Sequence, residues 1–218
     1  MEIEAKYRVA DGAAFESIGG LTALGRYRLE PQPEVERQVN TYFDTPERTL
    51  TRQRATLRLR QVGAHQIVSV KRSRPTRGAL HIRDEWETEL GELTHPHDWP
   101  PSQARTRALD LIGDAALFVL LRVRTRRRRA MVYHGARRVA EIALDTGAIM
   151  AGGRTIGFRE VEIELAGGSC RDLRALVGEL QRRVSIEPEP RGKKSRGLAL
   201  MPQQPRSLGP ALRPRLRG

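Results

Sequence analysis

The sequence has 218 residues and a formal net charge of +13, from 39 lysines and arginines against 26 aspartates and glutamates. This length suits one domain or two small ones. No stretch approaches the ~20 consecutive apolar residues that a membrane-spanning helix requires, and the charged start of the chain lacks the apolar segment of a signal peptide. The single cysteine, Cys170, excludes an internal disulfide framework and a multi-cysteine zinc site. We therefore expect a cytoplasmic protein with no membrane contact.

Alternation of charged and apolar residues, the pattern of strands with two different faces, recurs along the chain. It predicts strands at 2–9, 55–60, 85–90, 121–126, 139–145 and 160–165. Helices are predicted between them at about 12–22, at about 103–112 and at 171–183, the first two capped by Asp11 and Ser102. We expect one domain over residues 1–200. Residues 201–218, rich in proline and arginine and without acidic residues, are predicted to form a disordered basic tail.

The charged faces of the predicted strands are almost purely ionic. For any single strand, an ordinary half-exposed sheet is the favoured explanation, because charge on a solvated face is common. Taken together, the strands favour a closed barrel whose apolar faces pack outward under helices and whose ionic faces line the interior. So many interior charges are tolerable only if they neutralise one another, metal ions and a bound anion. Carboxylates without histidine or cysteine favour Mg²⁺ or Mn²⁺, and this combination suits phosphoryl transfer.

Nine short motifs follow one another along the chain. They are Glu2-x-Glu4-x-Lys6, Tyr42-Phe43-Asp44-Thr45-Pro46, Leu57-Arg58-Leu59-Arg60, Val70-Lys71-Arg72, Glu85-x-Glu87, Arg124-Thr125-Arg126-Arg127, Ala143-Leu144-Asp145-Thr146-Gly147, Glu160-Val161-Glu162-Ile163-Glu164 and Gly192-Lys193-Lys194-Ser195-Arg196-Gly197. In this order they resemble the CYTH domain, the triphosphate tunnel metalloenzyme superfamily. Each motif is weak alone, but the set covers about residues 1–200.

The resemblance implies an α+β fold, an eight-stranded antiparallel β-barrel (a triphosphate tunnel) with helices packed outside. It also implies a metal-dependent triphosphatase that uses Mg²⁺ or Mn²⁺. The residues it assigns to substrate binding are Lys6, Arg58, Arg60, Lys71, Arg124, Arg126 and Lys193. The metal ligands it implies are Glu2, Glu4, Asp145, Glu162 and Glu164, with Glu160 on the same face. The catalytic residues it implies are Glu4, Lys6, Glu85 and Glu87. The last two are expected to contact the second metal ion or the attacking water.

Three small-molecule triphosphates compete as substrate. Inorganic tripolyphosphate, hydrolysed to pyrophosphate and phosphate, needs only charge and is favoured here. Thiamine triphosphate would require an aromatic surface, for which Tyr42 is the best inward candidate, and a class IV adenylate cyclase would require nucleobase contacts that the sequence does not identify.

An alternative of another class is a non-catalytic module that binds polyphosphate or nucleic acid. The carboxylates interleaved with the arginines oppose it, because a surface for a phosphate backbone should be nearly all positive. Nucleic acid is therefore not an expected partner. The oligomeric state stays open, with a homodimer among the options.

Overall fold

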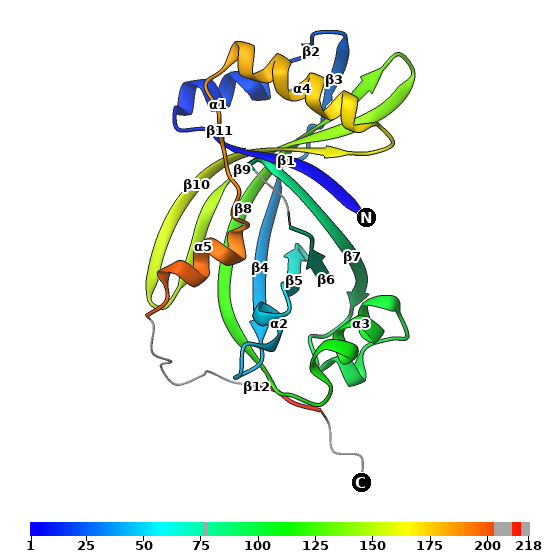
Figure 1. Ribbon diagram of the computed structural model, residues 1–218, viewed down its shortest axis with the longest axis vertical. Helices are drawn as coiled ribbons and strands as arrows, with labels where there is room; N and C mark the ends of the chain where they lie inside the picture. Colours follow the sequence, from blue (N-terminus) through cyan, green and yellow to red (C-terminus); the bar gives the residue numbers. More distant parts are fainter. Residues whose placement is uncertain (76–77, 203–210, 215–218) are drawn as a thin grey trace.

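The computed structural model describes residues 1–75, 78–202 and 211–214 (Figure 1). Its centre is a closed barrel of eight antiparallel strands. In order around the ring these are β8 (Leu117–His134), β4 (Glu36–Asp44), β5 (Ala55–Val62), β6 (His65–Ser73), β7 (Leu80–Leu90), β1 (Glu2–Arg8), β10 (Arg154–Leu165) and β9 (Arg137–Ala151). Pairing of β9 with β8 closes the ring. The expected antiparallel barrel with helices around it is confirmed.

Shorter elements surround the barrel. The short strands are β2 (Ala23–Leu24), β3 (Tyr27–Pro31), β11 (Glu187–Pro188) and β12 (Ala211–Leu212). The helices are α1 (Gly12–Gly19), α2 (Thr49–Arg52), α3 (Gln103–Ile112), α4 (Cys170–Arg183) and α5 (Lys193–Leu200), with a 3₁₀ turn η1 (Pro96–Asp98). None of the helices in the described ranges is long and apolar enough to cross a membrane.

The predicted helices begin where their capping residues indicate. The side chain of Asp11 accepts a hydrogen bond from the backbone N–H of Ala13, and Ser102 accepts one from Arg105. The first helix ends at Gly19, three residues earlier than predicted. The predicted disorder of 201–218 falls largely outside the described residues, but Ala211–Leu212 form a strand beside β8, which the sequence did not predict.

The apolar faces of most strands pack outward against helices, as the alternation predicted. Phe15 of α1 and Leu176 of α4 lie in one buried cluster with Ile163 of β10. Ala108 of α3 lies in a second cluster with Val70 of β6. In Figure 1, α1 and α4 lie together at one end of the barrel, while α3 lies near β7 at the other. The ionic faces of the same strands are left to line the interior.

Candidate active site

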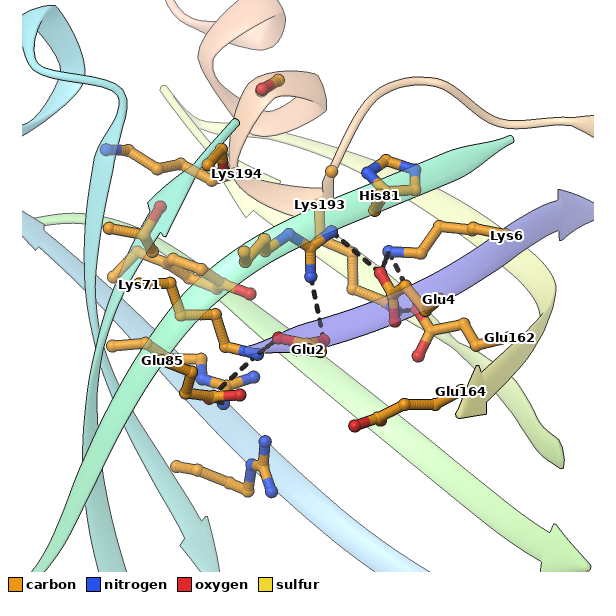
Figure 2. A pocket seen from close by; sticks show the side chains of 18 of the residues that line it. Glu2, Glu4, Lys6, Lys71, His81, Glu85, Glu162, Glu164, Lys193 and Lys194 are labelled. Carbon is orange, nitrogen blue, oxygen red and sulfur yellow. Dashed lines mark hydrogen bonds and ion pairs between the residues drawn. The ribbon is translucent and has the colours of Figure 1, made fainter. Parts of the chain in front are cut away.

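The barrel encloses a cavity of about 600 Å³ whose walls are strongly charged (Figure 2). Its lining includes eleven lysines or arginines and eight glutamates, while Tyr42 is the one Phe, Tyr or Trp among the described lining residues. The lining cations are Lys6, Arg54, Arg58, Arg60, Lys71, Arg74, Arg83, Arg127, Arg129, Lys193 and Lys194. The lining glutamates are Glu2, Glu4, Glu36, Glu85, Glu87, Glu141, Glu162 and Glu164. Such a cavity has the charges to hold a compact, highly charged anion.

Strand β1 supplies the centre of this lining. Its alternation turns Glu2, Glu4 and Lys6 inward, and pairing with β10 sets Lys6 opposite Glu162. The Lys6 ammonium lies 3.0 Å from a Glu162 oxygen and 3.4 Å from a Glu4 oxygen. Burial tends to lower the pKa of Lys6, but these two carboxylates outweigh it and the pKa is raised. Lys6 is therefore a permanent cation in the cavity wall.

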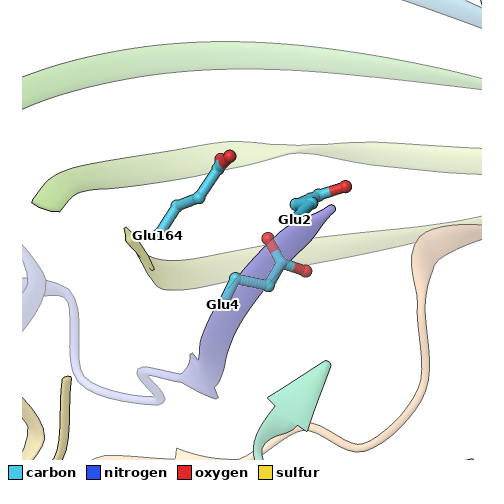
Figure 3. A group of neighbouring side chains, drawn as sticks. All are labelled: Glu2, Glu4 and Glu164. Carbon is cyan, nitrogen blue, oxygen red and sulfur yellow. The ribbon is translucent and has the colours of Figure 1, made fainter. Parts of the chain in front are cut away.

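Three carboxylates gather beside Lys6. Oxygens of Glu2, Glu4 and Glu164 all lie within 4.8 Å of one another (Figure 3). Glu164 is exposed to the cavity, and partial desolvation there together with repulsion from Glu2 and Glu4 raises its pKa to about 7. One buried oxygen of Glu4 accepts no hydrogen bond of good geometry, but it lies 2.8 Å from the Arg83 guanidinium and 3.4 Å from the Lys6 ammonium. An all-carboxylate set fits a hard divalent cation, which would share Glu4 with these two cations.

A second carboxylate group surrounds Lys193 at the start of α5. Asp145, Glu160 and Glu162 come together from β9 and β10, and the Lys193 ammonium lies 2.9, 2.9 and 2.8 Å from their respective oxygens. Arg127 adds contacts of 2.7 Å to Asp145 and 2.6 Å to Glu162. A protein ammonium occupies the centre of this group, so a metal held by Asp145 and Glu162 would have to share or displace it.

The remaining predicted cations and carboxylates line the wall formed by β5, β6 and β7. Lys71 lies 2.8 Å from Glu2 and 2.9 Å from Glu85. Arg58 lies 3.5 Å from both Glu85 and Glu87. Arg60 pairs with Glu87 more loosely, at 4.0 Å. These predicted residues are brought together, each cation facing a carboxylate.

Two predicted substrate-binding residues lie elsewhere. Arg124 and Arg126 are exposed and do not line the cavity, whereas Arg127 and Arg129 of the same strand do. The prediction assumed that the apolar face of β8 points outward. At this end of the barrel it points inward instead, where Leu121 lies in a buried cluster with Ile149 of β9 and Gly197 of α5 packs against both. Placing Arg124 and Arg126 in the tunnel was therefore wrong.

Sequence reasoning also missed cavity residues. Arg83 of β7 lies 3.2 Å from Glu2 and 2.8 Å from Glu4, and these carboxylates outweigh burial to raise its pKa. The two-residue spacing of Arg83, Glu85 and Glu87 could have revealed it, since alternate residues share a face. His81 also lines the cavity, hydrogen-bonded to the carbonyl of Glu189 at 3.0 Å. Burial and nearby Lys6 lower the pKa of His81, which favours a neutral ring.

The Tyr42–Pro46 motif is mainly structural. The Asp44 carboxylate accepts hydrogen bonds from the backbone N–H groups of Leu50 and Thr51 and so anchors α2. Lys194 of α5 donates a 2.8 Å hydrogen bond to the carbonyl of Ala55 at the start of β5. These contacts fix two helices relative to the cavity.

Comparison with known proteins identifies the family. The CYTH domain matches residues 1–197, and the chain belongs to this family. An inorganic triphosphatase of Haemophilus influenzae is 28% identical over 168 residues, which make up 76% of this chain and 46% of that protein. The chain thus spans about half the length of this curated relative.

Solved structures share the fold. A protein from Hippeastrum, whose name reports a dominant triphosphatase activity, has a TM-score of 0.68 at 22% identity, with 92% of this chain and 97% of that chain covered. A candidate adenylate cyclase from Bacillus halodurans has a TM-score of 0.61 at 22% identity, covering 88% and 94% of the two chains. At these identities the likeness supports the barrel architecture alone.

Proposed function

We propose that this chain hydrolyses inorganic tripolyphosphate to pyrophosphate and phosphate with the help of a divalent cation. The observation that carries the proposal is the composition of the cavity, which pairs eleven cations with eight glutamates in its described lining. The family membership and the named activity of the Haemophilus influenzae relative support it. Because charge alone recognises tripolyphosphate, no ring-binding surface is needed.

The cavity offers little for an organic triphosphate. Tyr42 is the single Phe, Tyr or Trp in its described lining, and its side chain is largely buried in an apolar cluster. A thiazolium, pyrimidine or adenine ring would find few surfaces for stacking. Trp86 of β7 packs outward against the cluster under α3. The inorganic substrate therefore suits this wall better than thiamine triphosphate or ATP.

The cationic residues would hold the phosphate chain. Lys6 of β1, Arg58 and Arg60 of β5 and Lys71 of β6 line one cavity, and Arg127 of β8 extends the set. Guanidinium groups can bind phosphate oxygens in a forked geometry and ammonium groups as point charges. We propose Lys193 as a further contact, which reaches the substrate from α5. Together these groups would orient the terminal phosphorus toward a water molecule.

Glu2, Glu4 and Glu164 would hold the divalent cation, with Asp145 and Glu162 as further candidate ligands at the Lys193 group. The ion, when bound, would offset negative charge on the phosphate oxygens. Mg²⁺ and Mn²⁺ both prefer the oxygen ligands found here.

Glu85 and Glu87 are our candidates to orient the attacking water, whose oxygen forms the new bond to phosphorus as the bond to the bridging oxygen breaks. The proton of the water would pass to a cavity carboxylate. The cations fixed around the phosphate chain would stabilise the charge that develops on the departing pyrophosphate.

The proposal is tested by phosphate release from tripolyphosphate, thiamine triphosphate and ATP, each with Mg²⁺, Mn²⁺ or a chelator. We expect metal-dependent release that is highest from tripolyphosphate. Higher release from an organic triphosphate would replace the proposed substrate, and cyclic AMP in the ATP samples would indicate a cyclase. Metal-independent polyphosphate binding without any release would favour a binding module instead.

A further inference from the structure

The two arginines found outside the tunnel belong to a regular patch on the outer barrel wall. On β4, β8, β9 and β10, outward residues form three cross-strand rows in register. The rows are Thr41–Arg122–Met150–Thr155, Val39–Arg124–Ala148–Gly157 and Arg37–Arg126–Thr146–Arg159. None of these residues is buried. We call these twelve residues the arginine face.

Every charged residue of the arginine face is positive. It contains five arginines and no aspartate or glutamate. Within the described part of the chain, none of the five lies within ion-pair distance of a carboxylate; Arg159 donates a hydrogen bond to the carbonyl of Ala10 instead. The tunnel differs, because there the cations face carboxylates at short distances. The two sides of the same wall therefore carry different kinds of charge.

The next outward arginine on β8 provides a comparison within the strand. Arg128 lies where α1 covers the barrel, and its guanidinium is 2.8 Å from Glu16 and stacks over Phe15. Arg122, Arg124 and Arg126 have no such partner among the described residues. Arginine is abundant throughout the sequence, which explains why arginines occur here. It does not explain why carboxylates are missing from the arginine face.

The pairing of β4 with β8 also places like charges opposite each other. Arg37 lies directly opposite Arg126 on neighbouring strands, and like charges at such positions destabilise a sheet. Arg124 follows two residues away on the same face, about 6.8 Å along the strand. A bound polyanion would convert this repulsion into attraction, which identifies the kind of partner the face would accept.

The composition narrows the class of polyanion. The face has no aromatic residue on which the bases of a single strand could stack. The centre of a protein interface is typically enriched in aromatic residues and depleted of charge, whereas the middle row here has no aromatic residue and carries the charge of Arg124 beside Val39. Arg122, Arg124 and Arg126 follow one another at two-residue intervals on β8, so the outer two lie about 14 Å apart along one strand. This is comparable to the width of the major groove of B-form DNA, about 12 Å, so Arg122 and Arg126 can reach phosphates on both strands.

We infer that the arginine face binds the phosphate backbone of double-stranded DNA without regard to base sequence. This interaction lies on the outer wall and is separate from triphosphate hydrolysis in the tunnel. It also departs from the expectation that nucleic acid is not a partner, which rested on the carboxylates interleaved with the arginines; the arginine face contains no such carboxylates. With few contacts, the affinity should be that of non-specific binding, with a dissociation constant of ~10⁻⁴–10⁻⁶ M at physiological salt.

The test compares two triple variants of the whole chain that lose the same charge. The first, Arg37→Gln/Arg124→Gln/Arg126→Gln, alters the arginine face. The control, Arg52→Gln/Arg171→Gln/Arg174→Gln, alters exposed arginines of α2 and α4. Fluorescence anisotropy of a labelled 20-base-pair duplex of mixed sequence is measured over a series of salt concentrations, and the melting temperature of each variant checks its folding.

We expect the face variant to bind the duplex at least ~10-fold more weakly and to lower the slope of log K against log salt by up to ~2.7, about 0.9 per lost phosphate contact. The control should bind like the unaltered chain, and both variants should keep tripolyphosphate hydrolysis. Equal weakening in both variants would overturn the inference, because it would reflect net charge alone. So would duplex binding that is undetectable, or tight binding of long-chain polyphosphate or single-stranded DNA with none of the duplex.

Discussion

The ammonium nitrogen of Lys193 lies 2.8 Å from a carboxylate oxygen of Glu162, although 31 residues separate them (Figure 2). This contact ties α5 to the charged wall of the barrel. Burial tends to lower the pKa of Lys193, but Asp145, Glu162 and Glu160 outweigh it and the pKa lies well above its usual value. Lys193 is thus both a proposed substrate contact and part of the fold.

Lys193→Ala should strongly destabilise the protein. It would leave three buried carboxylates with only Arg127, Arg196 and Lys6 as partners among the described residues, and breaking a buried ion pair costs about 3–5 kcal/mol. Urea denaturation measures the free energy of unfolding. Arg182→Ala, which removes the exposed pair with Glu179, is the control and should cost less than about 1 kcal/mol. Similar losses in the two variants would contradict a structural role for Lys193.

Glu4→Gln should lower turnover of tripolyphosphate at least ~100-fold, the scale of losing one electrostatic contact in a preorganised site. It should also weaken Mn²⁺ binding measured by calorimetry without substrate, because Glu4 belongs to the carboxylate group with Glu2 and Glu164. Glu92→Gln, on an exposed loop, should change neither quantity. Normal Mn²⁺ affinity in a folded Glu4→Gln protein would remove Glu4 from the proposed metal ligands.

Arg126→Gln and Arg127→Gln test which face of β8 serves the tunnel. The two substitutions are adjacent and chemically identical, but Arg127 contacts Asp145 and Glu162 whereas Arg126 is exposed. We expect Arg127→Gln to lower kcat/KM for tripolyphosphate at least ~30-fold, about 2 kcal/mol of transition-state stabilisation, and Arg126→Gln to retain it. The reverse result would show that the strand has the register first expected from the sequence.

The stability of the metal-free protein should depend on pH through Glu164. Its pKa is raised to about 7 by partial desolvation and by Glu2 and Glu4, compared with about 4.3 in an unfolded chain. Between these pH values the folded state keeps a proton that the unfolded state releases. The contribution of Glu164 to the free energy of unfolding is therefore complete below about pH 4 and is lost as the pH rises through about 7.

Melting temperatures of the unaltered protein and Glu164→Gln, compared with a chelator present, should therefore diverge as the pH rises. The variant should be the more stable of the two at pH 8 and should match the unaltered protein near pH 4. Saturating Mg²⁺ should close the gap, since the cation would offset the same repulsion. A gap that is constant with pH would show that Glu164 does not titrate in this range.

Local alternation predicted most of the barrel, because each strand separates charged from apolar residues. Glu2, Glu4 and Lys6 could be placed on one face from spacing alone, and Asp11 and Ser102 marked two helix starts. Alternation does not say which face is the inner one. On β8 both faces carry arginines, and the choice depends on α5, whose Gly197 packs against Leu121 from the inside. That contact joins residues distant in sequence, so no local pattern could reveal it.

The order in which the strands are synthesised differs from their order around the barrel. β1 is synthesised before both of its neighbours in the ring, β7 and β10. About 160 further residues must therefore be synthesised before both edges of β1 can be paired. An unpaired strand edge invites aggregation. Four of the seven side chains of β1 are charged, those of Glu2, Glu4, Lys6 and Arg8. Three of these charges line the finished cavity, and the same charges also oppose aggregation of the unpaired strand during translation.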